Sequence, residues 1–440
     1  MTGGDISPLP RENFPMQVCI IGRNSPRLLK IFLYLICLLS ISSSAFAEEL
    51  DLQLLIDEAL RNNREMLAAQ SRVGAYTYRI PQAGSLPDPM FTFGYQNDTL
   101  SSYTYGQSPD SKWMFELSQT FPFAGKRGLR EDMAKADAES QKAAYEALQR
   151  RVISKVSENY YDLFFAYQSL DIIGDRKALF SSMEEAALAR YSSGMASQQD
   201  AIMAQAEKYM LQEKEEMLRQ KIQTLEGMLN LFIGRDTSLP LGRPSAGREA
   251  RLDETLGELV KMAYDRSPEI RAKEKMIAGA EAKVNMSKKE YFPDVTLNAG
   301  TDQRGGDFTN MYKLTASINL PVFFSTRQEP AVKEAQAQLL ETKHELEATK
   351  LMISSSIREN FAMAASAQRL MALYRNALIP KSTQDYQAAL TAYSNGKADA
   401  LTVVTRLKAL IEYEVLYWNQ FSERQKAIAR IGAYTGDLAK

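Results

Sequence analysis

The chain has 440 residues, with 53 basic and 54 acidic side chains and a formal net charge of −1. This balance offers no general attraction for phosphate backbones, so we expect no nucleic-acid partner. Hydrophobic residues make up 45% and charged residues 24% of the chain, which excludes a wholly disordered protein.

Residues 1–47 have the pattern of a secretory signal peptide. Basic residues precede the apolar run 31–39, and Ala45-Phe46-Ala47 supplies the small residues of a cleavage site. We therefore expect cleavage before Glu48 and export of the mature chain. Both cysteines lie within 1–47, so the mature chain is expected to have no thiol.

The next elements are a helix and a β-hairpin. Residues 54–75 carry apolar side chains at helical spacing, and Pro81 is expected to break or kink this helix. Strict alternation of apolar and polar residues then predicts a hairpin over about 89–121. One face of this hairpin is apolar and the other is polar.

A very long helix follows the hairpin. No proline occurs from Leu129 to Tyr191, which predicts roughly 60 helical residues, on the order of 90 Å. A second helix is expected to run to about Phe232 and to stop at Gly234.

A short turn separates these two helices and recurs later in the chain. Tyr191-Ser192-Ser193-Gly194 matches Tyr393-Ser394-Asn395-Gly396. The glycine provides the positive φ that ends a helix, and Ser197 or Asp399 provides a side-chain oxygen to cap the next one. Each copy therefore predicts a tight turn between long antiparallel helices.

The second half of the chain repeats the first in the same order. It includes a second alternating hairpin over about 294–320. We therefore predict one domain of two tandem structural repeats, 48–236 and 252–440, joined by a linker at 237–251.

Four strands separated by such long helices raise the question of what covers the apolar face. A soluble sheet packed on a core would show the same alternation. Strands of roughly 9–11 residues also suit a tilted membrane strand, and four of them cannot close a barrel alone. The pattern favours association of several copies into a membrane β-barrel, in which about a dozen strands would leave an open lumen.

The chain resembles the TolC-like outer-membrane efflux proteins. Three features carry the resemblance: Leu86-Pro87-Asp88-Pro89, the run 118–127 (Ser-Gln-Thr-Phe-Pro-Phe-Ala-Gly-Lys-Arg), and the duplicated Tyr-Ser-x-Gly turns. The resemblance covers essentially the whole mature chain in element order and spacing. It implies a mainly α-helical homotrimer with a shared twelve-stranded β-barrel in outer-membrane lipid, continued by an α-helical tunnel in the periplasm.

The resemblance also implies partners and a function. Such a protein is a passive exit duct of a tripartite efflux system, docking with a periplasmic adaptor and an inner-membrane pump. The Pro-Asp-Pro and Pro-Phe-Ala-Gly-Lys-Arg segments resemble those of members that accompany heavy-metal cation pumps, while small organic solutes remain open as cargo. Two alternatives are the outer-membrane duct of a type I protein secretion system and a soluble periplasmic helical scaffold or adaptor.

The resemblance assigns roles to the two turns. Tyr191, Gly194, Tyr393 and Gly396 would lie at the periplasmic mouth and contact the adaptor, although helix capping alone would also explain them.

A tunnel gate is the second role that the resemblance implies. Asp200, Tyr393 and Lys397 fall where the family narrows its closed tunnel. Asp200 is also spaced to form a capping pair with Ser197. Some members carry aspartates where this chain has Thr402 and Thr405, so an acidic ring would be thinner here.

The residue inventory argues against an enzyme. The single histidine, His344, lies between Lys343 and Glu345 on a predicted helix, and the mature part has no cysteine nucleophile, phosphate-binding glycine loop or zinc-ligand cluster. The scattered methionines suit core packing. We therefore expect no catalytic residues, no cofactor and no resident metal. Trp113 and Tyr312, at strand ends, could belong to an aromatic girdle at the membrane interface.

Overall fold

A computed structural model describes residues 49–247 and 251–436. The expected signal peptide, 1–47, lies outside the described residues, as does part of the expected linker, 237–251. The part of the chain from Glu49 onward forms one compact unit, and the description below concerns this unit alone.

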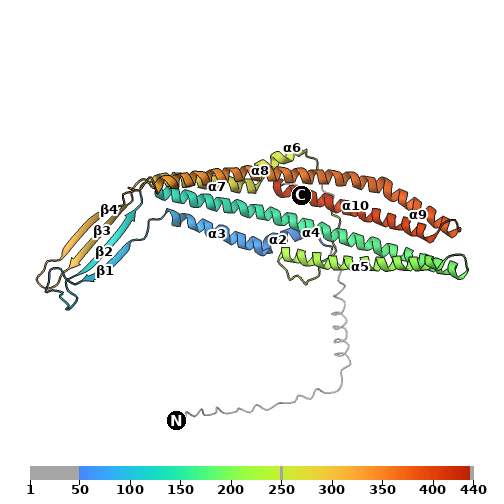
Figure 1. Ribbon diagram of the computed structural model, residues 1–440, viewed down its shortest axis with the longest axis horizontal. Helices are drawn as coiled ribbons and strands as arrows, with labels where there is room; N and C mark the ends of the chain where they lie inside the picture. The colour runs from blue at the N-terminus through green and yellow to red at the C-terminus, as the bar shows by residue number, and fades with distance from the viewer. Residues whose placement is uncertain (1–48, 248–250, 437–440) are drawn as a thin grey trace, which may run out of the picture. The chain divides into compact units, whose positions relative to one another are not determined.

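Long helices and one small sheet make up this unit (Figure 1). In chain order the elements are α2 (Leu52–Asn62), α3 (Arg64–Gly84), β1 (Met90–Gln96), β2 (Lys112–Phe121), α4 (Lys126–Ser192), α5 (Gln198–Ile233), α6 (Leu256–Arg266), α7 (Pro268–Lys289), β3 (Val295–Gln303), β4 (Met311–Ile318), α8 (Gln328–Leu373), the π-helical turn η1 (Tyr374–Leu378), α9 (Ile379–Ser394) and α10 (Ala400–Thr435). Figure 1 shows the sheet at one end and the α4–α5 and α9–α10 turns at the other.

The helix α4 is the central element of the bundle. It has 67 residues, which corresponds to about 100 Å of helix. It packs against α3 and α7 in its first part and against α5 and α10 further along. Buried small side chains such as Ala134, Ala138 and Ala143 allow the neighbouring helices to approach closely.

The corresponding run in the second half is interrupted by a π-helical turn. α8, η1 and α9 follow one another directly, and Pro380 is the second residue of α9. Proline lacks an N–H and its ring crowds the carbonyl four residues earlier. The wider η1 turn, which ends two residues before Pro380, accommodates both effects.

The first helical segment differs from the prediction. Pro81 lies inside α3 and does not end it, and the break falls at Asn63 instead. The Asn63 side chain accepts a hydrogen bond from the Met66 N–H at 3.0 Å and donates to the Phe232 carbonyl at 2.9 Å. This N-cap ends α2 and starts α3, whereas Pro81 lies in the last turn of α3, where only three helical residues follow it.

The four strands form one antiparallel sheet in the order β1-β2-β3-β4. The central β2–β3 pairing joins the two halves of the chain, with Leu117 opposite Ala299. Within the described chain, β1 and β4 are the edges of the sheet.

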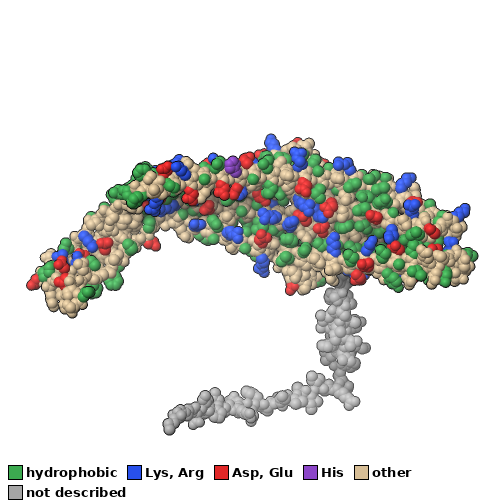
Figure 2. Space-filling model, in the orientation of Figure 1, with side chains coloured by type: hydrophobic (Ala, Val, Ile, Leu, Met, Phe, Trp, Pro, Cys, Tyr) green, Lys and Arg blue, Asp and Glu red, His purple; other side chains and the backbone are tan. Residues whose placement is uncertain are grey.

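Apolar clusters hold the helices together at two levels. One lies around Tyr160, Phe164 and Leu229 in the middle of the bundle, and another around Phe180, Tyr393 and Leu407 near the turns. On the face seen in Figure 2, acidic and basic side chains are interspersed along the helices. No helix among the described residues is both long and apolar enough to cross a membrane.

Candidate functional site

The two predicted turns have the same backbone geometry. Gly194 has φ +73° and Gly396 has φ +72°. In the first turn the Met195 N–H donates to the Arg190 carbonyl, and in the second the Lys397 N–H donates to the Ala392 carbonyl, both at 2.8 Å. These are Schellman-type helix ends, which need the left-handed conformation that glycine adopts without strain.

The helices after the turns are capped differently. Asp399 caps α10 as predicted, because its carboxylate accepts from the Thr402 N–H at 2.9 Å. The prediction for Ser197 is wrong, since its side chain makes no capping bond to α5. Its hydroxyl instead lies 3.3 Å from Oδ1 of Asp200, to which it donates.

An arginine links the two turns. The Arg190 guanidinium lies 4.5 Å from the centre of the Tyr393 ring and donates a hydrogen bond to the Tyr393 carbonyl. Tyr393 is only 4% exposed, and among the described residues its hydroxyl has no hydrogen-bond partner. Burial raises the pKa of this hydroxyl, Arg190 opposes the shift and the charge of Asp200 adds to it. The geometry thus brings Arg190 and Tyr393 together.

Lys397, the third residue of the predicted gate, is placed differently. Its side chain is exposed and makes no ion pair within the described part of the chain, with Asp200 or with another acid. The cation that contacts Tyr393 is Arg190, which the sequence did not suggest. Arg190 lies in the last turn of α4, where a cation interacts favourably with the helix C-terminus. This position is the sequence signal that could have indicated a role for Arg190.

Large apolar side chains are exposed around the turns. Tyr191 is 46% exposed, and it is accompanied by Leu188, Met195, Ile202, Leu390 and Leu401. Such a collection at the end of a helical bundle is typical of a protein contact surface.

The sheet separates apolar from polar side chains by face. The register places Phe93 opposite Phe115, and Leu117 opposite Ala299, which in turn lies opposite Leu314. Leu314 is 80% exposed. The other large apolar side chains of this face are also exposed: Phe91, Phe93, Leu117, Leu297, Tyr312 and Ile318. The opposite face carries polar groups, such as Thr120 and Thr296, whose hydroxyls lie 2.9 Å apart. Of the two predicted girdle residues, Tyr312 is exposed and Trp113 packs on Tyr95 at 5.0 Å.

A buried lysine connects the sheet to the bundle. Lys126, the first residue of α4, is 2% exposed, and its ammonium lies 2.9 Å from Oδ1 of Asp294 and 3.3 Å from Oε2 of Glu290. The same Asp294 oxygen accepts from the Phe123 N–H at 2.8 Å. Burial alone would raise the pKa of Asp294, but the bonds from Lys126 and Phe123 lower it overall. The Lys-Arg motif at 126–127 had been identified only as a point of resemblance.

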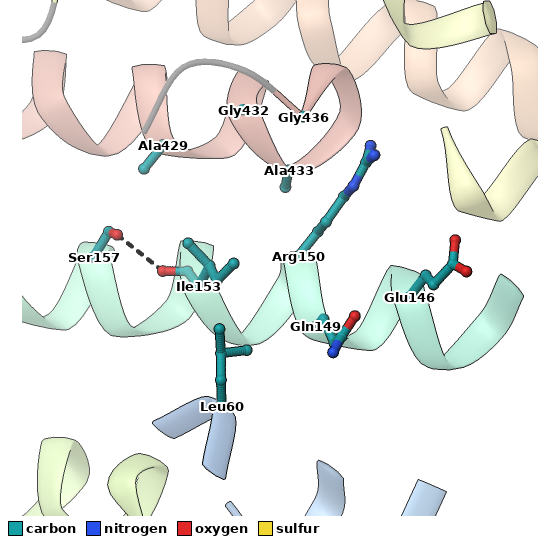
Figure 3. Close-up of a pocket in the computed structure, with 10 residues that line it drawn as sticks. All are labelled: Leu60, Glu146, Gln149, Arg150, Ile153, Ser157, Ala429, Gly432, Ala433 and Gly436. Atoms are coloured by element: carbon teal, nitrogen blue, oxygen red, sulfur yellow. Dashed lines mark hydrogen bonds between the residues drawn. The ribbon is translucent and has the colours of Figure 1, made fainter. Parts of the chain in front are cut away.

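The middle of the bundle contains a pocket of about 380 Å³ between α4 and the end of α10 (Figure 3). Arg150 points from α4 toward α10 and donates to the Tyr434 carbonyl at 3.2 Å. Glu146 in the same wall is paired with Arg271 at 3.0 Å. The Arg150 bond fastens the C-terminal end of α10 to α4, and the Glu146 ion pair joins α4 to α7. Among the described residues no cluster of three or more His, Cys, Asp or Glu side chains could hold a metal ion.

Comparison with known proteins places these features in one family. The profile of the family described as "Outer membrane efflux protein" matches residues 55–235 and 259–414. The cobalt-zinc-cadmium resistance protein CzcC of Cupriavidus metallidurans is 20% identical over 395 residues, covering 89% of this chain and 91% of CzcC.

Solved structures show the same fold. The structure of CusC, described in terms of transmembrane channel formation, has a TM-score of 0.77 at 16% identity, covering 88% of this chain and 92% of CusC. The open state of the MtrE outer membrane channel of Neisseria gonorrhoeae has a TM-score of 0.72 at 16% identity, covering 88% of each chain.

Proposed function

The chain belongs to the outer membrane efflux protein family, and from this premise we propose that it is the outer-membrane channel of a tripartite efflux system. It is an outer-membrane protein. Three copies would join their sheets edge to edge into a twelve-stranded barrel, continued by a periplasmic tunnel of helices. The two halves of each protomer, each contributing one hairpin and its helices, would be structural repeats of one another.

The observation that carries this proposal is the state of the sheet in one protomer. Its apolar face is exposed, with Leu314 at 80%, and no helix of the described chain covers it. Its edge strands β1 and β4 have unpaired backbone groups, which lipid does not tolerate. Association of several copies resolves both problems at once, because it pairs the edges and turns the apolar face toward lipid.

The paired turns would meet the partners. They lie at the end of the helices opposite the sheet (Figure 1) and carry the exposed apolar side chains around Tyr191. We propose that Tyr191, Gly194, Tyr393 and Gly396 form the contact with a periplasmic adaptor, and that the adaptor joins the duct to an inner-membrane pump. Asp200, Tyr393 and Lys397 would narrow the tunnel at this end, with Arg190 holding Tyr393 in place.

The duct itself would be passive. The energy would come from the pump, and no catalytic group is required of this chain. CzcC is named for cobalt, zinc and cadmium resistance, and its similarity over 89% of this chain supports metal cations as cargo.

Two neighbouring residues of β4 test the barrel. Leu314 and Thr315 are both exposed in a single protomer but point to opposite faces of the sheet. We expect Thr315→Cys in outer-membrane vesicles to react with a hydrophilic, membrane-impermeant maleimide and Leu314→Cys to be protected by lipid. After extraction and denaturation both should react fully. Equal labelling of both positions in the membrane would refute the barrel.

A further inference from the structure

All charged side chains of the four strands meet in one place. They are Lys112 and Glu116 on β2, Asp302 on β3 and Lys313 on β4. By the strand register all four lie on the polar face, toward the loop end of the sheet, away from the helices. We call them the four-charge cluster.

The four side chains pair with one another across three strands. The Lys112 ammonium lies 2.8 Å from Oδ2 of Asp302. The Lys313 ammonium lies 3.1 Å from Glu116 and 3.7 Å from the other oxygen of Asp302. Two lysines and two acids therefore cancel, and the cluster has no net charge.

A glycine makes this arrangement possible. Gly300 lies between Glu116 and Lys313 in the register, so the Lys313 side chain must cross β3 to reach Glu116. A Cβ on Gly300 would come within 2.8 Å of the Lys313 Cε and within 2.8 Å of the Phe115 carbonyl oxygen. The missing side chain thus provides the space in which the lysine stem lies.

We propose that the four-charge cluster sets the ion selectivity of the barrel lumen: because its charges balance, the strands add no preference for cations or anions, and loss of one partner creates such a preference. This inference rests on the proposed function, because it needs the polar face to line the lumen. Lys313 and Glu116 remain 39% and 33% exposed at their side chains, so ions in the lumen would feel their charges. If one of the four residues is neutralised, each copy keeps one unbalanced charge. Three assembled copies would then place three unbalanced charges around the lumen.

The size of the effect follows from Coulomb's law with screening. Three charges about 10 Å from the pore axis, in water with a Debye length of about 10 Å, change the cation-to-anion permeability ratio by about fivefold. Lys313→Gln should shift this ratio toward cations, and Glu116→Gln should shift it toward anions. The double variant Lys313→Gln/Glu116→Gln has no net change in charge and should return to the wild-type ratio.

The experiment measures reversal potentials of the purified protein in planar bilayers under a KCl gradient. Glu58→Gln serves as the control, since it removes one charge from an ion pair, 2.6 Å to Arg235, in the middle of the helical part. Opposite shifts in the two single variants, with recovery in the double variant, support the proposal. The double variant lacks the Lys313–Glu116 ion pair but has the same net charge as the wild type. A wild-type permeability ratio in this variant would therefore show that the charge, and not the stability of the strands, determines selectivity.

Other results would overturn the inference. Reversal potentials that stay at the wild-type value in both single variants exclude the cluster as a determinant of selectivity. A double variant that remains as selective as Lys313→Gln attributes the effect to altered structure. If the wild-type protein forms no pore at all, the proposed function fails instead, so the two failures are distinguishable.

Discussion

At the level of single residues, Arg190 has the largest consequence for the turns. It is the last basic residue of α4, yet its guanidinium contacts both the ring and the carbonyl of Tyr393, in the last turn of α9. A cation–π contact contributes about 0.5–2 kcal/mol, and a hydrogen bond to a charged donor about 1.5–3 kcal/mol. Arg190 therefore couples the positions of the two turns.

We expect Arg190→Gln to loosen this end of the tunnel. A loss of about 2 kcal/mol would raise the fraction of open tunnels by roughly 30-fold. Single-channel recording in planar bilayers should show more frequent opening, or a larger mean conductance, than in the wild type. Lys214→Gln is the control, because Lys214 on α5 is an exposed cation that has no ion pair in the described chain and no role in the proposed gate. Equal behaviour of both variants would contradict a holding role for Arg190.

A second residue-scale prediction concerns Glu158 in the middle of the bundle. It is buried and lies 2.8 Å from Arg430 and 3.4 Å from Lys155. Burial would raise its pKa, but Arg430 and then Lys155 outweigh burial and lower it. A lowered folded-state pKa means that the stabilisation is complete above the ordinary value of about 4.3 and is lost as the pH falls through the folded value.

Glu158→Gln should therefore change the pH dependence of stability. We expect the variant to be less stable than the wild type at pH 7, by about 1–3 kcal/mol, because its amide pairs less strongly with Arg430. The difference should begin to shrink below about pH 4.3, where the carboxylate of the unfolded chain takes up protons, and should be lost as the pH falls through the lowered folded-state pKa. Thermal unfolding followed by circular dichroism from pH 7 to pH 3 measures both effects. A difference that stays constant with pH would exclude this ion pair as its source.

Local chemistry explains which residue predictions succeeded. Asp399 was predicted as a cap from its place after a turn, and a cap needs only local backbone geometry. Arg190 was missed because its contact with Tyr393 depends on how α4 and α9 lie together, which no local spacing reveals. The same holds for Lys126, because its partners Glu290 and Asp294 are distant from it in the sequence.

At the level of elements, the turns depend on the conformation of two glycines. Among the described residues no atom lies within 4 Å of a Cβ built on Gly194, so space is not what requires glycine there. The positive φ is the requirement, since a side-chain-bearing residue in this region costs about 1–2 kcal/mol and a β-branched one more. Any effect of substitution should therefore be confined to the shape of the turn.

We expect Gly194→Val to impair export while the protein stays abundant in the outer membrane. The strained turn would displace Tyr191 and its apolar neighbours from the surface proposed for the adaptor. Growth under metal stress and immunoblots of outer-membrane fractions measure the two quantities. Gly74→Ala is the control, because Gly74 lies in α3 without a positive φ and a Cβ there has open space. Normal export by Gly194→Val would argue against the docking role.

Periodicity and glycine positions located most of the elements. The alternating stretches became β1 to β4, and the predicted stop at Gly234 is confirmed by its φ of +75° as the C-cap of α5. Pro81 did not break the helix where the prediction allowed a break; only three residues of α3 follow it, so its missing N–H and its ring affect the last turn alone. The break at Asn63 was missed because its bond to the Phe232 carbonyl depends on the packing of α5.

At the level of the whole molecule, the four-stranded sheet has two unpaired edges, β1 and β4, within the described chain. The sequence predicted its two faces, because alternation depends only on the geometry of a strand. It could not predict that β2 pairs with β3, nor that Lys313 crosses β3 above Gly300, because both depend on the register between distant segments. The register fixes which residues would face lipid and which the lumen in an assembled barrel.

That assignment makes a final prediction for the assembled protein. We expect Leu314→Arg to reduce membrane insertion strongly, since an arginine on the lipid face near the bilayer midplane costs about 2–4 kcal/mol. Thr315→Arg, one residue further along β4, should be tolerated because it would point into a polar lumen. Both side chains are exposed in a single protomer, so a soluble protein should tolerate both variants equally. The electrophoretic mobility of outer-membrane fractions, with and without heating, measures how much assembled protein each variant forms. Similar amounts for both variants would contradict the proposed orientation of the sheet.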